Sequence, residues 1–372
     1  MKVVIAAAGT GGHINPGIAI ANKIKAEEKN TDVLFIGTDY GLEKDLVPRA
    51  GFKLKTIHAH GLSKKFTIET IKNNIETFKG TFEAKKILKE FKPDIVIGTG
   101  GYICGPVIMA AKSLKIPRIL HESNAFPGLA VKKLGPKVDT VLVGFEDAKK
   151  RLPNVKNVVV TGTPSKMKKI NMSENEKQKI KKELGLKENL PLVLVFGGSQ
   201  GARTINKAVT EMILKNLNKN YQIILAAGPK QYDEIKKELE NKGKNIENLE
   251  NSKILPYIYN MEEVMNACDL AICRSGAMTI TEISTAGKPA IFIPLPNVSQ
   301  NHQEYNARVL ADRGAARIIL DANLNEQTLG EEIDSLISNE AKLQEMGKKA
   351  EEISIKNVEE QIYKEIKKII RN

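Results

Sequence analysis

The chain has 372 residues, with 57 Lys and Arg against 44 Asp and Glu, three cysteines and no tryptophan. At ~100–200 residues per domain, this length predicts two or three domains that each bury their own core. Three scattered cysteines are too few for a disulfide framework or a metal cluster, which indicates a reducing compartment.

The positive charge restricts the class of partner only in part. Basic proteins attract nucleic acid, anionic lipid or phosphorylated substrates. Most of the excess here is lysine, and the scarcity of interleaved aromatic and arginine residues disfavours nucleic acid. A strand that begins at Lys2 leaves no room for a signal peptide, and no apolar run approaches the ~18 residues needed to span a bilayer. We therefore expect a soluble cytoplasmic protein.

The first predicted strand, Val3 to Ala8, runs into a glycine loop that reads Gly9-Thr10-Gly11-Gly12-His13. A helix is predicted from there to about Lys29. Such a loop between strand and helix is typical of phosphate or dinucleotide sites. The dinucleotide fingerprint is broken, however, because Ile14 stands where the third glycine belongs. Adjacent glycines still allow a bulky ligand to approach the backbone closely.

Residues 61–92 differ from their surroundings in being rich in lysine. Their apolar side chains fall on one helical stripe, which consists of Ile68, Ile71, Ile75, Phe78 and Phe82. One interpretation is a surface helix that buries this stripe in the core and leaves its charges in water. The other is a patch that binds anionic lipid, with ~1 kcal/mol from each lysine near the surface. The residues of that patch would be Lys64, Lys65, Phe66, Ile68 and Lys72.

Further strands of this half are each followed by loops rich in glycine or polar residues. The loop after Ile97 contains Gly100-Gly101-Tyr102, and the strand that ends at Leu120 leads to His121-Glu122-Ser123-Asn124. Alternation of strands and helices with such loops at the strand ends predicts a doubly wound parallel sheet.

The architecture restarts after a Lys-, Glu- and Asn-rich connection at residues 165–190. A strand from Leu192 to Phe196 is followed by Gly197-Gly198-Ser199-Gln200-Gly201-Ala202. We therefore expect two similar doubly wound, Rossmann-like α/β domains that face each other across a cleft, which is a common place for a ligand. From about Glu345 the tail is predicted to form one long amphipathic helix.

The stretch from Cys273 to Pro289 predicts strand, tight loop, helix and helix stop. Ser275 is a suitable N-cap, so the loop would present free backbone N–H groups to an anion at the positive end of a helix. Glu282 lies about two turns further along and can accept hydrogen bonds from vicinal hydroxyls such as those of a ribose. The alternative is an ordinary crossover helix with a solvated glutamate.

Together these motifs resemble the bacterial peptidoglycan N-acetylglucosaminyltransferases, which form glycosyltransferase family 28 and have the two-domain GT-B fold. The resemblance runs nearly end to end. It rests on six motifs in order: Gly9 to His13 with Pro16; Gly100-Gly101-Tyr102 with Gly105-Pro106; His121 to Asn124; Gly197 to Ala202; Arg274-Ser275-Gly276-Ala277 with Thr279 and Glu282; and Asn301-His302-Gln303-Glu304.

The resemblance implies inverting transfer of GlcNAc from UDP-GlcNAc to the C4 hydroxyl of undecaprenyl-pyrophosphoryl-MurNAc-pentapeptide (lipid I), giving lipid II and UDP. This step serves cell-wall synthesis and hence cell shape and division. It implies an N-terminal acceptor and membrane-associating domain at 1–162, a UDP-GlcNAc-binding domain at 163–349, and a C-terminal helix at about 350–372 that packs back onto the first. The expected location is the cytoplasmic face of the membrane, as a peripheral protein without cofactor or metal.

The resemblance also implies which residues bind the donor. Ile258 would lie at the uracil, Glu282 would hold the ribose, and Gln303 with His302 would recognise GlcNAc. The remaining donor-binding candidates are Thr10, Gly11, Gly12, Asn124, Ser199, Ala277, Met278, Thr279, Ile280 and Thr281. Lys166 stands where the family often has arginine; lysine keeps the charge but loses the bidentate geometry, so Lys166 is a candidate donor contact only.

His13 is the leading candidate for the general base, because an imidazole with an ordinary pKa of ~6.5 suits proton transfer at neutral pH. Two other roles stay open for it: binding of the acceptor pyrophosphate, and structural hydrogen bonding. His121 is expected to be structural because it follows directly from a strand, with assistance to the reaction as the alternative. The chain contains no Asp-x-Asp motif for a metal-bound diphosphate, so the helix start at Ser275–Ala277 would replace the cation.

Other functions would use the same fold. A UDP-GlcNAc 2-epimerase would need further acidic residues and a histidine at the sugar, and no lipid surface. A diacylglycerol glucosyltransferase would share the membrane patch but not the muramyl acceptor. A non-catalytic nucleotide-sugar sensor would keep the C-terminal site and could lose His13. A basic RNA-binding protein is disfavoured by the composition.

Overall fold

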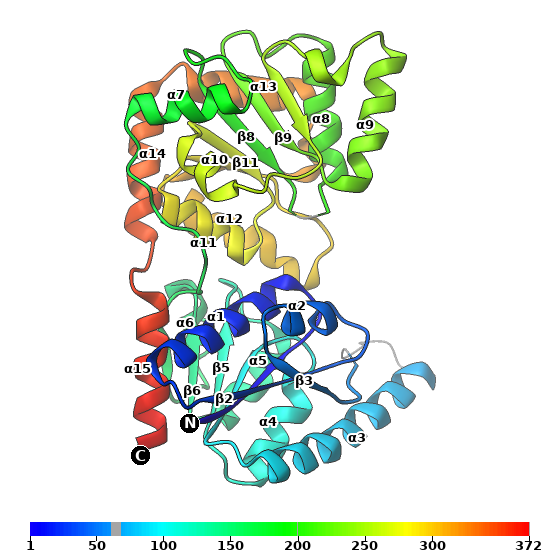
Figure 1. Ribbon diagram of the computed structural model, residues 1–372, viewed down its shortest axis with the longest axis vertical. Coiled ribbons are helices and arrows are strands. Elements are labelled where there is room, and N and C mark those ends of the chain that lie inside the picture. Colours follow the sequence, from blue (N-terminus) through cyan, green and yellow to red (C-terminus); the bar gives the residue numbers. More distant parts are fainter. Residues whose placement is uncertain (61–67, 199, 372) are drawn as a thin grey trace. The chain divides into compact units, whose positions relative to one another are not determined.

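The computed structural model describes residues 1–60, 68–198 and 200–371, with residues 68–74 described by their backbone alone. The chain divides into two compact units (Figure 1). Unit 1 comprises Met1–Ser165 and Ile355–Asn372, and unit 2 comprises Lys166–Ser354. Each unit contains one parallel β-sheet, of seven and six strands respectively. This confirms the predicted fold class of two doubly wound parallel-sheet domains.

The sheet of unit 1 has the strand order β3-β2-β1-β4-β5-β6-β7, and all neighbouring strands are parallel. Its strands are β1 (Lys2–Ala7), β2 (Asp32–Gly37), β3 (Lys53–Thr56), β4 (Ile95–Gly100), β5 (Arg118–Glu122), β6 (Thr140–Val143) and β7 (Val158–Val160). Its helices are α1 (Gly11–Glu27), α2 (Glu43–Arg49), α3 (Ile68–Phe91), α4 (Cys104–Ser113), α5 (Leu129–Leu134), η1 (Gly135–Lys137), α6 (Glu146–Lys149) and α15 (Val358–Arg371).

Successive residues of β1 serve two separate cores in unit 1. Val4 and Ala6 belong to a cluster that also contains residues of α3 and α4. Val3 and Ile5 belong to a second cluster with residues of α1 and α15. Because side chains alternate across a strand, an unbroken apolar run fills both faces of a buried sheet.

The tail is two helices rather than one, so the prediction of a single long helix is wrong. Helix α14 (Glu340–Ile353) ends at Ser354, whose backbone is extended, and Asn357 adopts a left-handed conformation with φ 54°. After this break α15 packs against α1 in unit 1, where Ile362 and Ile366 are buried (Figure 1). Lys367 also pairs with Glu28 at the end of α1 at 2.5 Å.

Unit 2 has the strand order β10-β9-β8-β11-β12-β13, again wholly parallel. Its strands are β8 (Leu192–Phe196), β9 (Gln222–Ala226), β10 (Ser252–Leu255), β11 (Leu270–Cys273), β12 (Ala290–Phe292) and β13 (Ala316–Ile318). Its helices are α7 (Glu174–Glu183), α8 (Arg203–Leu214), α9 (Pro229–Asn241), η2 (Ile246–Asn248), α10 (Met261–Ala267), α11 (Ala277–Ala286), η3 (Ser299–Asn301), α12 (His302–Ala311), η4 (Asp321–Asn323), α13 (Glu326–Ile337) and α14.

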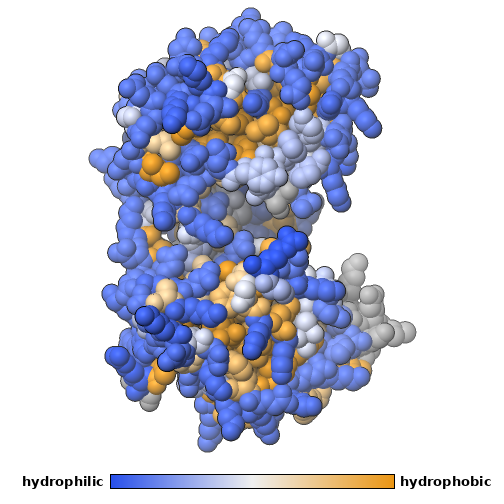
Figure 2. Space-filling model, in the orientation of Figure 1, coloured by the Kyte–Doolittle hydropathy of each residue, from blue (hydrophilic) through white to orange (hydrophobic). Residues whose placement is uncertain are grey.

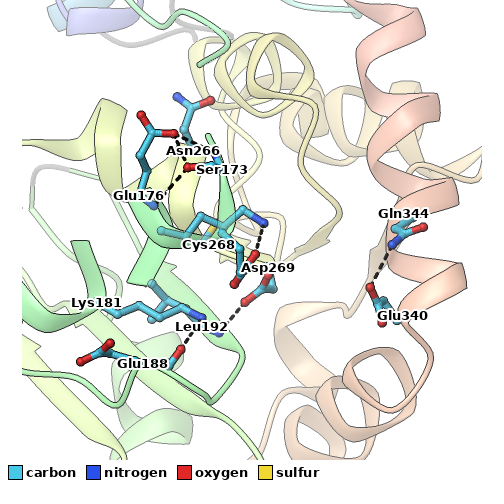
Figure 3. Close-up of polar contacts among 12 residues, drawn as sticks. Ser173, Glu176, Lys181, Glu188, Leu192, Asn266, Cys268, Asp269, Glu340 and Gln344 are labelled. Atoms are coloured by element: carbon cyan, nitrogen blue, oxygen red, sulfur yellow. Dashed lines mark hydrogen bonds and ion pairs between the residues drawn. The ribbon is translucent and has the colours of Figure 1, made fainter. Parts of the chain in front are cut away.

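Helix α7 lies in the connection that was predicted from composition, and side chains at its start fix it (Figure 3). The hydroxyl of Ser173 accepts a hydrogen bond from the Glu176 backbone N–H, and the Glu176 carboxylate accepts one from the Ser173 N–H at 2.7 Å. This reciprocal pair is a capping box. The Asp269 carboxylate accepts the Leu192 N–H at 2.7 Å, which ties the start of β8 to the approach to β11.

The apolar stripe on α3 does not lie in the core, so the interpretation of a buried stripe is wrong for its described part. Ile75, Phe78 and Phe82 are 54%, 65% and 61% exposed. Residues on the opposite side of the helix, Ala84 and Leu88, fill the core instead. The predicted patch residues Lys64, Lys65 and Phe66 lie outside the described residues, as do the side chains of Ile68 and Lys72.

The face of the molecule that is drawn in Figure 2 is mainly hydrophilic, interrupted by apolar areas in both units. Among residues 1–60, 68–198 and 200–371, no helix has the length and apolar character needed to cross a membrane.

Candidate functional site

In each unit, glycine loops follow the two central strands where the chain order reverses. In unit 1 these strands are β1 and β4, and in unit 2 they are β8 and β11. Parallel strands end at the same edge, so the loops after each pair lie next to one another. Ligands of doubly wound folds bind at this switch point.

His13 lies at the start of α1 and is held from three directions. Its Nδ1 lies 3.2 Å from the Ala8 carbonyl oxygen, and its own carbonyl accepts the Thr99 hydroxyl at 2.8 Å. A Cβ on Gly100 would lie 2.3 Å from the imidazole Cδ2, so only glycine lets β4 approach so closely. Because a carbonyl only accepts, this contact favours the proton on Nδ1 in the neutral imidazole, and that tautomer has its lone pair on Nε2. The ring itself is half-buried.

The other donor-binding candidates of unit 1 lie in two places, at the start of α1 and in the loop after β5. Thr10 is exposed at the N-cap of α1 without a side-chain capping bond, and Gly11 and Gly12 form the first turn. Asn124 follows β5, and its side-chain amide and backbone N–H both donate to the buried Glu122 carboxylate at 2.9 Å. The same carboxylate accepts the Gly128 N–H at 2.7 Å, so Glu122 shapes the loop that carries Asn124.

His121 is buried in unit 1, which fits the structural role predicted for it. It is fully buried, and its Nε2 donates to the Gly162 carbonyl at 3.0 Å. Desolvation lowers the pKa of its imidazole, which keeps the ring neutral.

In unit 2 the loop after β11 leaves the start of α11 uncapped by any side chain. The N-cap is Gly276 and not Ser275 as predicted, because the Ser275 hydroxyl donates instead to the Gln303 carbonyl at 2.8 Å. Asn306 in α12 donates to the Ser275 carbonyl at 3.1 Å. Helix α12 thus holds the loop, and the first N–H groups of the ten-residue helix α11 stay open to an anion.

The candidates along α11 differ in what they can offer a ligand. Ala277, Met278 and Thr279 are partly exposed on the first turn. Ile280 is fully buried, and its N–H donates to the Gly276 carbonyl at 3.0 Å, so its side chain serves packing. The Thr281 hydroxyl donates to the Ala277 carbonyl at 3.0 Å.

Glu282 is a half-buried carboxyl group on α11. Burial raises its pKa from 4.5 to about 7, and no charged group among the described residues lowers it again. A ligand that offers two hydroxyl donors would restore the hydrogen bonds that water supplies elsewhere. A raised pKa on a half-buried carboxyl is typical of a functional site.

Gln303 and His302 lie in the first turn of α12, and their side chains have different hydrogen-bond partners. The side-chain oxygen of Gln303 accepts the Leu295 N–H at 2.9 Å, which directs its amide nitrogen away from that contact. The Nδ1 of His302 donates to the Ser299 carbonyl at 2.9 Å. Both side chains are partly exposed.

The sequence did not predict the contacts of Arg274, a buried residue that connects several segments of unit 2. Arg274 forms an ion pair with Asp321 at 2.5 Å and donates to the Thr204 hydroxyl at 2.7 Å and to the Ile293 carbonyl at 3.0 Å. It therefore connects the loop after β11 with the start of α8 and with η4. The position of Arg274 in a motif was visible in the sequence, but its partners, 47 and 70 residues away, were not.

The remaining candidates lie in loops. Ile258 is 3% exposed between two exposed tyrosines, Tyr257 and Tyr259, whose rings meet edge-on at 5.0 Å. Lys166, the first residue of unit 2, is exposed. Ser199 lies outside the described residues.

Two doubly wound sheets, each with a glycine loop at its switch point, define a two-domain nucleotide-binding α/β protein. Residues 3–143 match the N-terminal domain of glycosyltransferase family 28, and residues 192–362 match its C-terminal domain. The chain belongs to glycosyltransferase family 28.

Relatives match along the whole chain. The UDP-N-acetylglucosamine--N-acetylmuramyl-(pentapeptide) pyrophosphoryl-undecaprenol N-acetylglucosamine transferase of Acetivibrio thermocellus is 46% identical, over 100% of this chain and 99% of the relative. The protein of the same name from Caldanaerobacter subterraneus subsp. tengcongensis is 43% identical, over 99% of this chain and 100% of the relative. The crystal structure of MurG from Acinetobacter baumannii superposes with a TM-score of 0.81 at 30% identity, covering 99% of both chains.

The fold itself is shared more widely. A UDP-GlcNAc 2-epimerase from Neisseria meningitidis, solved with UDP-GlcNAc bound, superposes with a TM-score of 0.65 at 17% identity. At that identity the likeness concerns the fold alone.

The raised pKa of Glu282 predicts how Glu282→Gln changes the pH dependence of stability. Between pH 4.5 and about 7 the unfolded chain ionises this carboxyl while the folded protein keeps it protonated, so wild-type stability falls as pH rises. Above pH 7 the free-energy cost of burying the ionised carboxylate no longer changes with pH. A glutamine at this position does not ionise and has no such cost. In urea unfolding, the variant should therefore gain on wild type by on the order of 1–3 kcal/mol across this window. The exposed Glu250→Gln is the control; a flat difference for Glu282→Gln would contradict the assignment.

Proposed function

We propose that this protein transfers GlcNAc from UDP-GlcNAc to the C4 hydroxyl of lipid I, with inversion, to give lipid II and UDP. The observation that carries the proposal is the full-length match, at 46% identity, to a transferase named for this donor and acceptor. The open helix start in unit 2 and the oriented imidazole in unit 1 supply the two kinds of group that this chemistry needs.

His13 acts as the general base. In an inverting transfer the acceptor hydroxyl must lose its proton as it attacks C1 of the donor sugar. The Nδ1–H contact to Ala8 leaves the Nε2 lone pair to accept that proton. A base so held does not have to reorient during the reaction, which lowers the cost of reaching the transition state.

The start of α11 stabilises the departing diphosphate. Its free N–H groups and the positive end of its dipole face charge that grows as the bond to C1 breaks. Ala277, Met278 and Thr279 contribute these N–H groups, and Glu282 accepts hydrogen bonds from the ribose hydroxyls.

The remaining contacts are assigned by the family resemblance. The loop at Ile258 receives the uracil, Gln303 and His302 contact the GlcNAc hydroxyls, and Lys166 is a further donor contact. Unit 2 is accordingly the donor-binding domain. Unit 1 is the acceptor domain, and by the same resemblance Thr10, Gly11, Gly12 and Asn124 of this unit are further donor-binding candidates.

The proposed location is peripheral, on the cytoplasmic face of the membrane, and helix α3 is the proposed contact with the lipid surface. Phe78 and Phe82 meet edge-on at 5.1 Å and remain exposed together with Ile75. Beside them a surface hollow of about 400 Å³ is lined by Phe82, Lys85, Lys86, Lys89 and Glu90. Exposed apolar rings bordered by lysines fit an interface of acyl chains and anionic headgroups.

The reaction is tested by UDP release from UDP-GlcNAc in EDTA, with and without a soluble lipid I analogue. We expect release to depend on the acceptor and to stop with a matched analogue that lacks the C4 hydroxyl. Release that is independent of the acceptor would contradict the transfer reaction. Tight binding of UDP-GlcNAc without any release would favour the sensor function.

The membrane surface is tested by sedimentation with vesicles that contain anionic lipid. Replacing both Phe78 and Phe82 by serine should lower the partition coefficient by about tenfold or more, because each ring contributes ~1.5–3 kcal/mol when buried. Tyr259→Ser removes an aromatic side chain that is 93% exposed in unit 2 and is the matched control. Equal binding of wild type and the double variant would refute the role of α3.

A further inference from the structure

A single peptide group links His13 to a buried carboxylate. The carbonyl of the Ala8–Gly9 peptide faces His13 Nδ1 at 3.2 Å, and the N–H of the same peptide donates to Glu43 Oε2 at 3.0 Å. We propose that Glu43 is a positioning residue for His13 and acts on it through this peptide. The inference rests on the proposed role of His13 as the base.

The Glu43 carboxylate is buried, hydrogen-bonded and surrounded by glycines that leave space for it. It is the first residue of α2 and is 0% exposed. Its second oxygen, Oε1, accepts both the N–H and the hydroxyl of Thr38, at 2.9 and 2.6 Å. A Cβ on Gly37 would lie 2.6 Å from the Glu43 side chain and one on Gly41 2.1 Å from it, so these two glycines make the space.

The partners of Glu43 suit a negative charge. Its oxygens receive two N–H donors and a hydroxyl, which matches the acceptor-only character of an ionised carboxylate. Within the part of the chain that the structure describes, no ion pair to Glu43 occurs. A buried carboxylate without a cation is costly unless hydrogen bonds compensate for the loss of water. The Glu43 carboxylate therefore depends on its three hydrogen bonds. One of the donors, the Gly9 N–H, belongs to the peptide whose carbonyl contacts His13.

The bond from Gly9 to Glu43 strengthens the bond from His13 to Ala8. When a peptide N–H donates to a charged acceptor, the carbonyl of that peptide becomes a better acceptor, and linked hydrogen bonds strengthen by about 10–30% each. A stronger Ala8 carbonyl favours the proton on Nδ1 and so the lone pair on Nε2. In the Ser-His-Asp triad a carboxylate fixes its histidine directly; here a peptide group lies between them.

The other neighbours of His13 make this bond decisive for its orientation. Thr99 holds the His13 backbone, and Gly100 lies against the ring. The Ala8 carbonyl is the contact that selects which nitrogen carries the proton. Glu43 sets both the strength of that contact and, through Gly9 at φ 95°, the orientation of its peptide plane.

A double-mutant cycle distinguishes this role from a merely structural one. Glu43→Gln keeps the shape and removes the charge, and it should lower kcat about tenfold to hundredfold while the KM for UDP-GlcNAc changes little. In the His13→Ala background the same change should have no further effect on kcat. An equal loss in both backgrounds would overturn the inference. Asp94→Asn is the matched control, because Asp94 accepts the Lys2 N–H at the opposite end of β1, at 2.7 Å.

A spectroscopic reading separates this inference from the proposed base role. With ¹⁵N-histidine in the full chain, the two ring nitrogens of His13 report its tautomer at pH 9, and His13→Ala identifies their signals. Glu43→Gln should shift the balance toward the proton on Nε2, whereas Asp94→Asn should leave the tautomer unchanged. An unchanged tautomer would overturn the inference even if His13→Ala abolishes turnover. Full turnover by His13→Ala would instead overturn the base role and leave the tautomer result standing.

Discussion

The hydrogen bonds on both sides of the Ala8–Gly9 peptide are the contacts on which the proposed chemistry of unit 1 depends. They join β1, the start of α1 and the buried carboxylate of α2 at the carboxyl edge of the sheet. Close approach of β4 from the other side is possible because Gly100 and Gly101 have no side chains; a Cβ on Gly101 would lie 2.5 Å from the Ala8 oxygen. A mobile loop could bind an anion, but it could not hold a base in one tautomer.

In unit 2 the carboxyl edge of the parallel sheet carries a helix start that favours an anion. Among the described residues, no side chain caps the start of α11, because the Ser275 hydroxyl donates to the Gln303 carbonyl and Asn306 donates to the Ser275 carbonyl. Glu282 is held half-buried further along α11 with a raised pKa. A positive helix end and a poorly solvated carboxyl together suit a ligand that combines a diphosphate with vicinal hydroxyls. The two halves of the proposed reaction, proton removal and departure of the leaving group, therefore fall to separate units.

Local sequence signals located the strands, the glycine loops and His13, because each depends on neighbours in the chain. The apolar run Leu192–Phe196 is strand β8, and Glu282 lies on α11 after a glycine-containing loop, as expected. The sequence did not reveal Glu43, whose partner Gly9 is 34 residues away. It also suggested Ser275 as a cap, although a partner on α12 competes for its hydroxyl. Tertiary contacts decided both cases, as they did for the α3 stripe, where the helix buries its other side.

The configuration of the new glycosidic bond tests the central claim most directly. One displacement at C1, assisted by a base on the acceptor hydroxyl, turns the α-linked donor into a β-linked product. Proton NMR of a reaction with UDP-GlcNAc and a soluble lipid I analogue should show one new β1,4 linkage for each UDP formed. An α-linked product, or a sugar altered at C2 with the acceptor unchanged, would contradict the account.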